Sequence, residues 1–188
     1  MDLTISFFNL WFFVVMGYVI IWAYMPVVNK KRGKPIEDPE LYNYANRRQM
    51  VCTWYISLFG QILTALFIPV QNGILFIIGS VLSIIGVALN FIAMSTFFDS
   101  PGKLNTKGIY QFSRNPMYVG GFLFILGLCI MGWNVSVPYG LFFVIFIYWI
   151  ITTHRTVKKE EIFLTHKYGK EYENFKKNIP RYIGFKRL

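Results

Sequence analysis

The sequence predicts an all-α, polytopic membrane protein with about five transmembrane helices and a C-terminal amphipathic cytoplasmic helix. Its composition is the first observation behind this prediction, because 55% of the 188 residues are hydrophobic and only 15% are charged. The second is that residues 3–28, 49–98 and 115–153 contain no Asp, Glu, Lys or Arg. A helix needs about 20 apolar residues to cross about 30 Å of hydrocarbon. The three stretches therefore hold one, two and two crossings.

Turn-forming residues divide the two longer stretches, at 69–73 and at 132–138. The five helices are expected at about 3–25, 50–69, 74–98, 116–133 and 137–154. The first should end near Pro26, after interfacial aromatic residues. The last two are short, so the alternative for them is a tilted or partly embedded hairpin. The chain is expected to form a single domain over residues 1–188.

The basic residues predict the orientation in the membrane. All 19 Lys and Arg lie within 30–48, 103–114 and 155–187, and the turns near residues 71 and 134 carry no charge. Five crossings place the three basic groups on one side and both neutral turns on the other. The positive-inside rule makes the basic side cytoplasmic, with the N-terminus outside and the C-terminus inside. A prokaryotic plasma membrane and the endoplasmic reticulum both suit this layout. The N-terminus lacks the basic region of a signal peptide, so its helix is expected to be retained.

Several classes of function are disfavoured by the residue content. The net charge is +10, but the cations flank hydrophobic spans, where they orient the chain and attract the headgroups of membrane lipids, so nucleic acid is not expected as a partner. Only two histidines occur, and no Cys/His cluster has the spacing of a metal site, so no metal is expected. The apolar spans lack ionisable groups, which disfavours an ion-coupled transporter.

The polar segment before the fourth expected helix carries a helix-start signal. Asn115 precedes Pro116; Asn caps free N–H groups, and Pro suits the first helical position because it has no N–H. The first N–H groups of this helix should therefore face the cytoplasm. Gly120 and Gly121, one turn further on, would let a backbone or a ligand approach closely.

The C-terminal tail has the pattern of an amphipathic helix. Spacings of 4, 4, 3 and 4 residues connect the members of one apolar stripe, which are Leu164, Tyr168, Tyr172, Phe175 and Ile179. Such a helix either lies on the membrane surface or packs over the cytoplasmic ends of the bundle. Gly169 predicts a weak point or a bend.

Polar chemistry is expected at the cytoplasmic face, around residues 114–116 and at Glu160 and Glu161. Adjacent carboxylates just past a membrane helix can hold hydroxyl groups, an amino group or a sulfonium. The alternative is that they only neutralise the nearby cations, as exposed charges usually do. Arg114 could likewise serve only as an interfacial anchor.

Two sequence blocks resemble the isoprenylcysteine carboxyl methyltransferase family, whose members are membrane enzymes related to phospholipid N-methyltransferases. The first block is Gly108-Ile109-Tyr110-x3-Arg114-Asn115-Pro116-x-Tyr118-x-Gly120. The second is Glu160-Glu161-x6-Tyr168-Gly169-x2-Tyr172, followed by Pro180-Arg181. The resemblance covers about residues 85–182, and the two blocks keep the order and separation seen in the family.

The resemblance implies S-adenosylmethionine as methyl donor, in a cofactor-binding region at about 102–182. The start of the fourth helix would favour the cofactor carboxylate, Tyr110 and Tyr118 would contact adenine or the sulfonium, and Glu160 would pair with an amino or hydroxyl group. The expected cofactor residues are Gly102, Lys103, Leu104, Asn105, Tyr110, Arg114, Asn115, Pro116, Met117, Tyr118 and Glu160.

The chain departs from the family pattern at two positions. Asn115 stands where the family commonly has His, and Thr156 stands where isoprenylcysteine enzymes have an Arg that holds the substrate carboxylate. Arg155 is the candidate replacement, although it lies about 100° round the helix. An amine or thiol acceptor would have to lose a proton, and His154 and Glu161 are the candidate bases for that step.

The leading hypothesis is methyl transfer to a lipophilic or small acceptor at the cytoplasmic face, with the carboxylate of prenylcysteine as one candidate. A phospholipid amine and a small thiol are alternative acceptors. A sterol-type reductase that uses NADPH is a second enzyme hypothesis, because its C-terminal region has a similar Arg-His-Pro-x-Tyr block. A non-catalytic membrane scaffold, in which both blocks only pack the helices, is the third.

Overall fold

A computed structural model describes residues 6, 8–32, 47–98 and 103–184 of the chain. All regular structure in these residues is helical, as the sequence predicts. The elements are α1 (Leu10–Arg32), α3 (Arg47–Ala65), α4 (Ile74–Phe98), the short 3-10 helix η1 (Gly108–Gln111), α5 (Pro116–Met131), α6 (Val137–Tyr168) and α7 (Lys170–Asn178).

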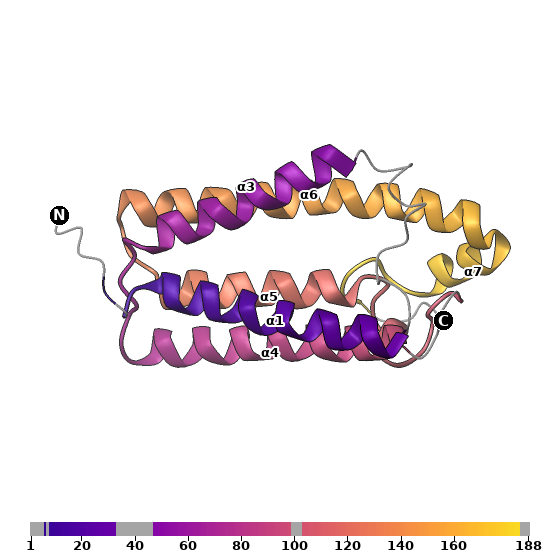
Figure 1. Ribbon diagram of the computed structural model, residues 1–188, viewed down its shortest axis with the longest axis horizontal. Helices are drawn as coiled ribbons and strands as arrows, with labels where there is room; N and C mark the ends of the chain where they lie inside the picture. Colours follow the sequence, from indigo (N-terminus) through magenta and orange to yellow (C-terminus); the bar gives the residue numbers. More distant parts are fainter. Residues whose placement is uncertain (1–5, 7, 33–46, 99–102, 185–188) are drawn as a thin grey trace.

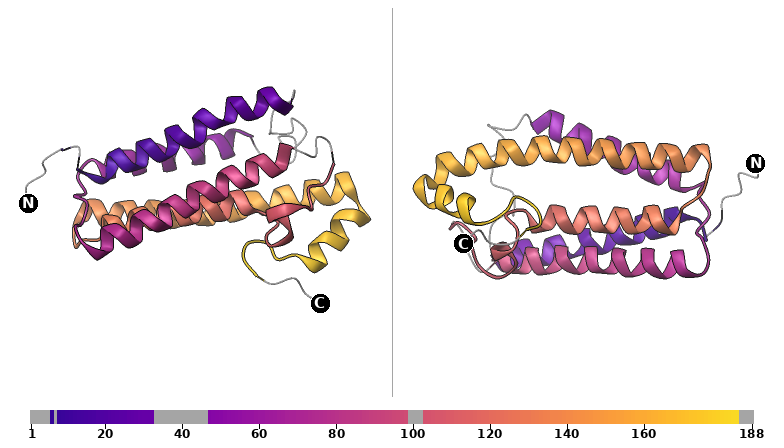
Figure 2. Two further views of the ribbon diagram at one scale, coloured as in Figure 1. Left: turned by 90° about the horizontal axis from the view of Figure 1, so that it is seen from below. Right: turned by 180° about the vertical axis from the view of Figure 1, so that it is seen from behind.

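The five long helices form a bundle of two layers (Figure 1). In one layer α3 lies beside α6, and in the other α1, α4 and α5 lie together. Helix α1 also contacts α3, so it closes one side of the space between the layers. Figure 2 shows α7 folded back at the end of the bundle that carries the described C-terminal segment.

Helices α4 and α5 make the most extensive contact in the bundle, because small residues let their backbones approach. A Cβ atom added to Gly79 would lie 2.5 Å from the carbonyl oxygen of Gly127, and one added to Gly120 would lie 2.6 Å from that of Gly86. The Ser83 hydroxyl donates to the carbonyl oxygen of Phe124 at 3.2 Å. Helices α4 and α5 are therefore closely packed against each other along their length.

The helices that are long and apolar enough to cross a membrane differ from those expected. By length and composition, residues 10–27 of α1, residues 74–96 of α4 and helix α6 can each cross a membrane. The shorter apolar helices are residues 51–65 of α3 and helix α5. The prediction that the fifth helix is short is therefore wrong, whereas α5 is indeed short. The chain is an integral, polytopic all-α membrane protein.

One end of the bundle gathers both uncharged turns and the start of α1. The Leu10 amide donates to the carbonyl oxygen of Ile68 at 2.8 Å, and the Gln71 amide donates to that of Met131 at 2.7 Å. An isolated antiparallel bridge pairs Asn9 with Pro69. These bonds place the two neutral turns together, as the charge pattern predicts.

Several expected helix boundaries are wrong. Helix α1 begins at Leu10 and continues through Pro26 to Arg32, and transmembrane helices tolerate an internal proline when neighbouring groups satisfy the freed carbonyl. Helix α3 covers 47–65 rather than 50–69, because residues 66–70 turn and bond to the start of α1. Helix α5 ends at Met131 rather than 133, and α4 has the expected bounds.

The largest difference lies in α6, which does not end near residue 154. It has 32 residues and is therefore about 48 Å long, which exceeds the hydrocarbon thickness of about 30 Å. Its uncharged part ends at His154, and its charged part begins at Arg155. Ser136 caps its start by accepting a bond from the Tyr139 amide at 3.3 Å.

The predicted amphipathic helix is divided between two elements. Leu164 and Tyr168 lie on α6, and the chain bends at Gly169, which has φ +53°. Tyr172 on α7 and Ile179 after it are buried. Of the two expected placements, α7 therefore takes the one in which its apolar side packs over the end of the bundle.

Candidate functional site

Tyr118 and Glu160, one from each family-like block, meet through a hydrogen bond. The Tyr118 hydroxyl donates to Glu160 Oε1 at 2.8 Å. Tyr118 lies in the first turn of α5, just after the Pro116 that starts the helix. Glu160 lies in the charged C-terminal part of α6. The resemblance placed both residues beside the cofactor, and the fold brings them into direct contact.

Glu161 lies in a buried ion cluster. Arg114 Nη1 lies 2.9 Å from its Oε1, and Arg181 donates from Nε to Oε1 at 2.9 Å and from Nη2 to Oε2 at 2.7 Å. The side chains of Arg114 and Glu161 are 7% and 6% exposed. The cluster joins α6, the turn before α5 and the segment after α7.

The electrostatics of this cluster keep Glu161 ionised. Burial by itself would raise the pKa of Glu161, but the hydrogen bond from Arg181 and the charges of Arg114, Arg181 and Lys176 together hold that pKa below its usual value. The same hydrogen bond raises the pKa of Arg181. Burial, with Glu161 nearby, raises the pKa of Tyr172 to about 12. A carboxylate held in this way is a poor proton acceptor, which argues against the expected role of Glu161 as a base.

The segment after α7 is bound to the turn that precedes α5. The Arg114 amide donates to the carbonyl oxygen of Pro180 at 3.0 Å. The carbonyl oxygen of Arg181 accepts from Asn115 Nδ2 at 3.0 Å and from the Ser113 hydroxyl at 3.4 Å. Asn115 occupies the N-cap position but makes no side-chain cap. The expected capping role is therefore wrong, because the amide is used to hold the C-terminal segment.

The expected cofactor loop lies against the end of α4. Asn105 is buried and donates from Nδ2 to the carbonyl oxygen of Thr96 at 2.9 Å. Lys103 is exposed, Leu104 is half-buried, and Tyr110 is buried within η1. Gly102 lies outside the described residues. The described part of this loop is thus on the same end of the bundle as Tyr118 and Glu160.

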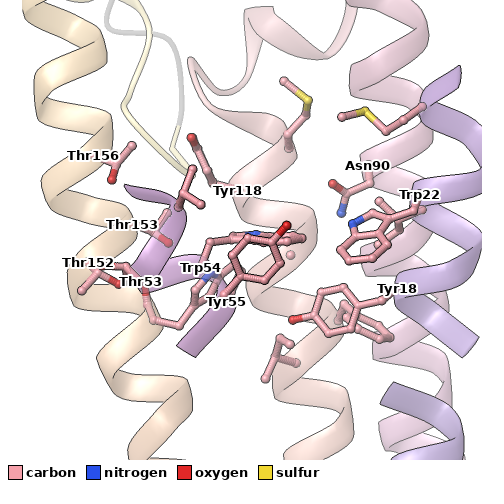
Figure 3. Close-up of a pocket in the computed structure, with 18 of the residues that line it drawn as sticks. Tyr18, Trp22, Thr53, Trp54, Tyr55, Asn90, Tyr118, Thr152, Thr153 and Thr156 are labelled. Atoms are coloured by element: carbon pink, nitrogen blue, oxygen red, sulfur yellow. Dashed lines mark hydrogen bonds between the residues drawn. The ribbon is translucent and has the colours of Figure 1, made fainter. Parts of the chain in front are cut away.

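A cavity of about 530 Å³ opens between the two helix layers (Figure 3). Its aromatic wall includes Tyr18 and Trp22 from α1 and Trp54 from α3, and the Trp22 and Trp54 rings stack with centroids 5.1 Å apart. Met117 and Tyr118 contribute from α5. Figure 3 shows Tyr118 toward one end of the cavity and Tyr18 toward the other. A volume of this size suits a small or lipid-like molecule.

None of the three expected catalytic residues, Arg155, His154 and Glu161, lines this cavity. Arg155 is exposed and is not among the lining residues, whereas its neighbour Thr156 is. His154 also lies outside the lining, and its Nδ1 is 3.1 Å from the Tyr182 hydroxyl. The geometry therefore does not support Arg155 as a ligand for an acceptor in the cavity, since a helix presents adjacent residues to different sides.

Comparison with known proteins assigns the chain to a family. The sequence profile described as phospholipid methyltransferase matches residues 59–171, which is more than half of the chain. The chain belongs to this family. The matched part of this phospholipid methyltransferase family member includes α4, α5, α6, the first sequence block and the second block up to Gly169.

Curated relatives confirm the resemblance to isoprenylcysteine carboxyl methyltransferases. The protein-S-isoprenylcysteine O-methyltransferase of Mus musculus is 37% identical over 84 residues, which are 44% of this chain and 28% of the relative. The protein of Homo sapiens gives the same values. That of Xenopus laevis is 29% identical over 90 residues, with 44% of this chain and 27% of the relative covered. The chain thus spans less than a third of the length of these relatives. No solved structure matches it.

Sequence reasoning missed two parts of the site. It assigned no role to Arg181, although the second block includes that residue, because a salt bridge across 20 positions leaves no local pattern. It interpreted the aromatic residues before Pro26, of which Trp22 is one, only as interfacial residues, and it did not identify Trp54. Both line the cavity because α1 and α3 pack against α5 and α6, and this packing is a property of the tertiary structure.

Proposed function

We propose that the protein is an S-adenosylmethionine-dependent methyltransferase that acts on a lipophilic acceptor at the basic end of the bundle. The observation that carries the proposal is the hydrogen bond from Tyr118, which lines the cavity, to Glu160. This hydrogen bond connects the two sequence blocks shared with the family. A polar cofactor and a lipophilic acceptor would meet at this position. The apolar cavity lining suits an acceptor that enters from the bilayer.

The residues around this contact suit the proposed cofactor. Glu160 offers a carboxylate for an amino or hydroxyl group, and the first turn of α5 offers a positive dipole end to a carboxylate. We assign the cofactor region to about residues 102–182 of a single catalytic domain. Its contacts are Gly102, Lys103, Leu104, Asn105, Tyr110, Arg114, Asn115, Pro116, Met117, Tyr118 and Glu160. When bound, the cofactor supplies an electrophilic methyl group on a sulfonium.

The ion cluster around Glu161 would act by positioning. It fixes the segment after α7 against the turn that starts α5, so Asn115 and Tyr118 would be presented in one arrangement. Methyl transfer depends mainly on holding two reactants in line and excluding water. The aromatic wall of the cavity would keep water away from the acceptor. Tyr118 would lie where the methyl donor and the acceptor come into contact.

We also propose that the basic end faces the cytoplasm, with the N-terminus outside. The cations between 103 and 114 and after 155 lie at this end, and the neutral turns lie at the other. Cytoplasmic loops carry the excess of Lys and Arg. A cytosolic cofactor would then have direct access to its site, in a prokaryotic plasma membrane or in the endoplasmic reticulum.

Binding of S-adenosylhomocysteine to the purified protein tests the proposal by isothermal titration. We expect binding by the wild type and by Tyr24→Phe, a control that removes a hydroxyl bonded to Ser95 outside the cavity. Tyr118→Ala removes the ring expected to contact adenine, and Glu160→Ala removes the carboxylate expected to pair with an amino or hydroxyl group. Each should weaken binding at least about tenfold, which corresponds to a loss of about 1.4 kcal/mol or more.

The same titration separates the alternatives. A sterol-type reductase would bind NADPH and not S-adenosylhomocysteine. A scaffold would bind neither, and all four proteins would behave alike. Either result would overturn the proposed function.

A further inference from the structure

We propose that this site methylates an uncharged, lipophilic thiol, and that Tyr118 and Glu160 accept the proton that the thiol loses. The inference rests on the proposed function and names the acceptor class for that same site. Three observations support it. The cavity lining carries no charge, Tyr118 bonds to Glu160, and the nearby Glu161 and His154 have partners outside the cavity.

The lining of the cavity favours an uncharged acceptor. None of its lining residues, all within the described part of the chain, has a charged side chain. Their polar groups are hydroxyls, one amide and three indole N–H groups, from Tyr18, Trp22, Thr53, Trp54, Tyr55, Asn90, Tyr118, Trp149, Thr152, Thr153 and Thr156. In the donor-free protein, transfer of an ionised carboxylate into such surroundings is costly, because the lining supplies no cation to pair with it. Glu160, which is bonded to the wall at Tyr118, would further repel an anion.

An uncharged nucleophile brings a proton that must leave during methyl transfer. Tyr118 is on the cavity wall and already donates to Glu160 Oε1 at 2.8 Å, which is within the range for proton transfer. The other nearby groups are engaged elsewhere. Glu161 is paired with Arg114 and Arg181, and His154 lies outside the lining beside Tyr182. The route from the cavity to a carboxylate therefore runs through Tyr118.

The bonds and charges balance along this route. The acceptor sulfur forms the new bond to the methyl group with its own electron pair. The bond between the methyl group and the sulfonium of the donor breaks, and its electron pair stays on the donor sulfur, which becomes neutral. The acceptor proton passes to Tyr118 Oη while the Tyr118 proton passes to Glu160, so the sulfonium charge and the carboxylate charge are both lost.

A thiol fits these conditions better than other protic groups. An alkyl amine has a pKa near 10.4 and enters as a cation at neutral pH, whereas a thiol that keeps its proton is uncharged. Sulfur is also a strong nucleophile once its proton is lost. An alcohol is much less acidic, so a carboxylate is a poor base for it.

Dodecanethiol and dodecanoate, which share a chain length, test the acceptor class. Purified protein in nanodiscs is first titrated with each compound without donor, and transfer from radiolabelled S-adenosylmethionine is then measured. We expect donor-free protein to bind the thiol more tightly than the carboxylate, and the product to be a base-stable thioether. Tyr118→Phe should keep thiol and S-adenosylhomocysteine binding but lower kcat at least about 100-fold, while Tyr24→Phe should match the wild type.

Three results would overturn the acceptor proposal: a base-labile methyl ester formed faster than the thioether, wild-type kcat in Tyr118→Phe, or no thioether from protein that binds S-adenosylhomocysteine. Failure to bind S-adenosylhomocysteine would instead overturn the proposed function, and this inference with it. The binding step thus separates the two failures.

Discussion

At the scale of single residues, the two adjacent glutamates have different environments and different roles. Glu160 bonds to a hydroxyl on the cavity wall, whereas Glu161 is enclosed by two guanidinium groups. An α-helix turns by about 100° per residue, so neighbours face different partners. The expectation that both only neutralise surface cations is wrong for Glu161, which is 5% exposed.

The pairing of Glu161 predicts how stability depends on pH. Its folded pKa is lowered, so the unfolded state binds the proton more tightly than the folded state. The stabilisation is present above the unfolded value of about 4.3 and is lost as pH falls through the folded value. We expect Glu161→Gln to lose about 3 kcal/mol at pH 7, because the buried Arg114 and the half-buried Arg181 lose their partner. The difference in unfolding free energy between this variant and the wild type should become smaller toward pH 3.

Thermal midpoints of the detergent-solubilised proteins at pH 7, 5, 4 and 3 check this prediction. Glu171→Gln is the matched control, since Glu171 is exposed on α7, and it should stay within about 0.5 kcal/mol of the wild type. A gap between wild type and Glu161→Gln that stayed constant over this range would show that the carboxylate does not stabilise the fold through its charge.

Some residue roles were predictable from the sequence and others were not. The sequence patterns identified Tyr118 and Glu160 as candidate cofactor residues, and the structure places them in contact. The local signal at Asn115 predicted a cap, but a long-range partner, the Arg181 carbonyl, takes its side chain. Local patterns describe neighbours along a helix, so they fail where a distant segment competes for the same group.

At the scale of elements, the turn between α6 and α7 sets the position of the C-terminal segment. Gly169 has φ +53° and ψ −128°, a conformation that L residues rarely adopt. A Cβ atom there would meet nothing within 4 Å, so backbone strain alone opposes a substitution. The sequence predicted a bend at this glycine, although it did not predict that α6 would reach it unbroken.

Gly169→Ala should therefore destabilise the turn by about 1–3 kcal/mol. Because α7 leads into the segment that holds Arg114 and Asn115, the variant should also bind S-adenosylhomocysteine more weakly. Gly140→Ala is the matched control: it too has open space around an added Cβ, lies inside α6, and should be neutral or gain up to about 1 kcal/mol. Thermal midpoints and limited proteolysis after residue 169 measure both effects. Equal behaviour of the two variants would contradict the role of this turn.

At the scale of the whole molecule, the sequence predicted the topology better than the cavity. Runs of apolar residues and the positions of charges are properties of the chain itself, and the structure confirms that the two neutral turns share one end. The cavity depends on how α1 and α3 sit against α5 and α6, which brings Tyr18, Trp54 and Thr156 into one lining from distant positions. A single sequence holds no direct signal of such packing.

The orientation of this bundle in the membrane leads to a labelling prediction. In a chain with Cys52→Ala and Cys129→Ala, single cysteines are introduced by Val135→Cys at the neutral end or Lys170→Cys at the basic end, both at exposed positions. Because Lys and Arg are retained on the cytoplasmic side, a membrane-impermeant maleimide should label the Val135→Cys protein in intact bacterial cells that carry it in the plasma membrane. It should label the Lys170→Cys protein only after permeabilisation, and the chain without cysteine should stay unlabelled. Labelling of the Lys170→Cys protein in intact cells would place the site outside, where a cytosolic cofactor could not reach it, and would overturn the proposed orientation.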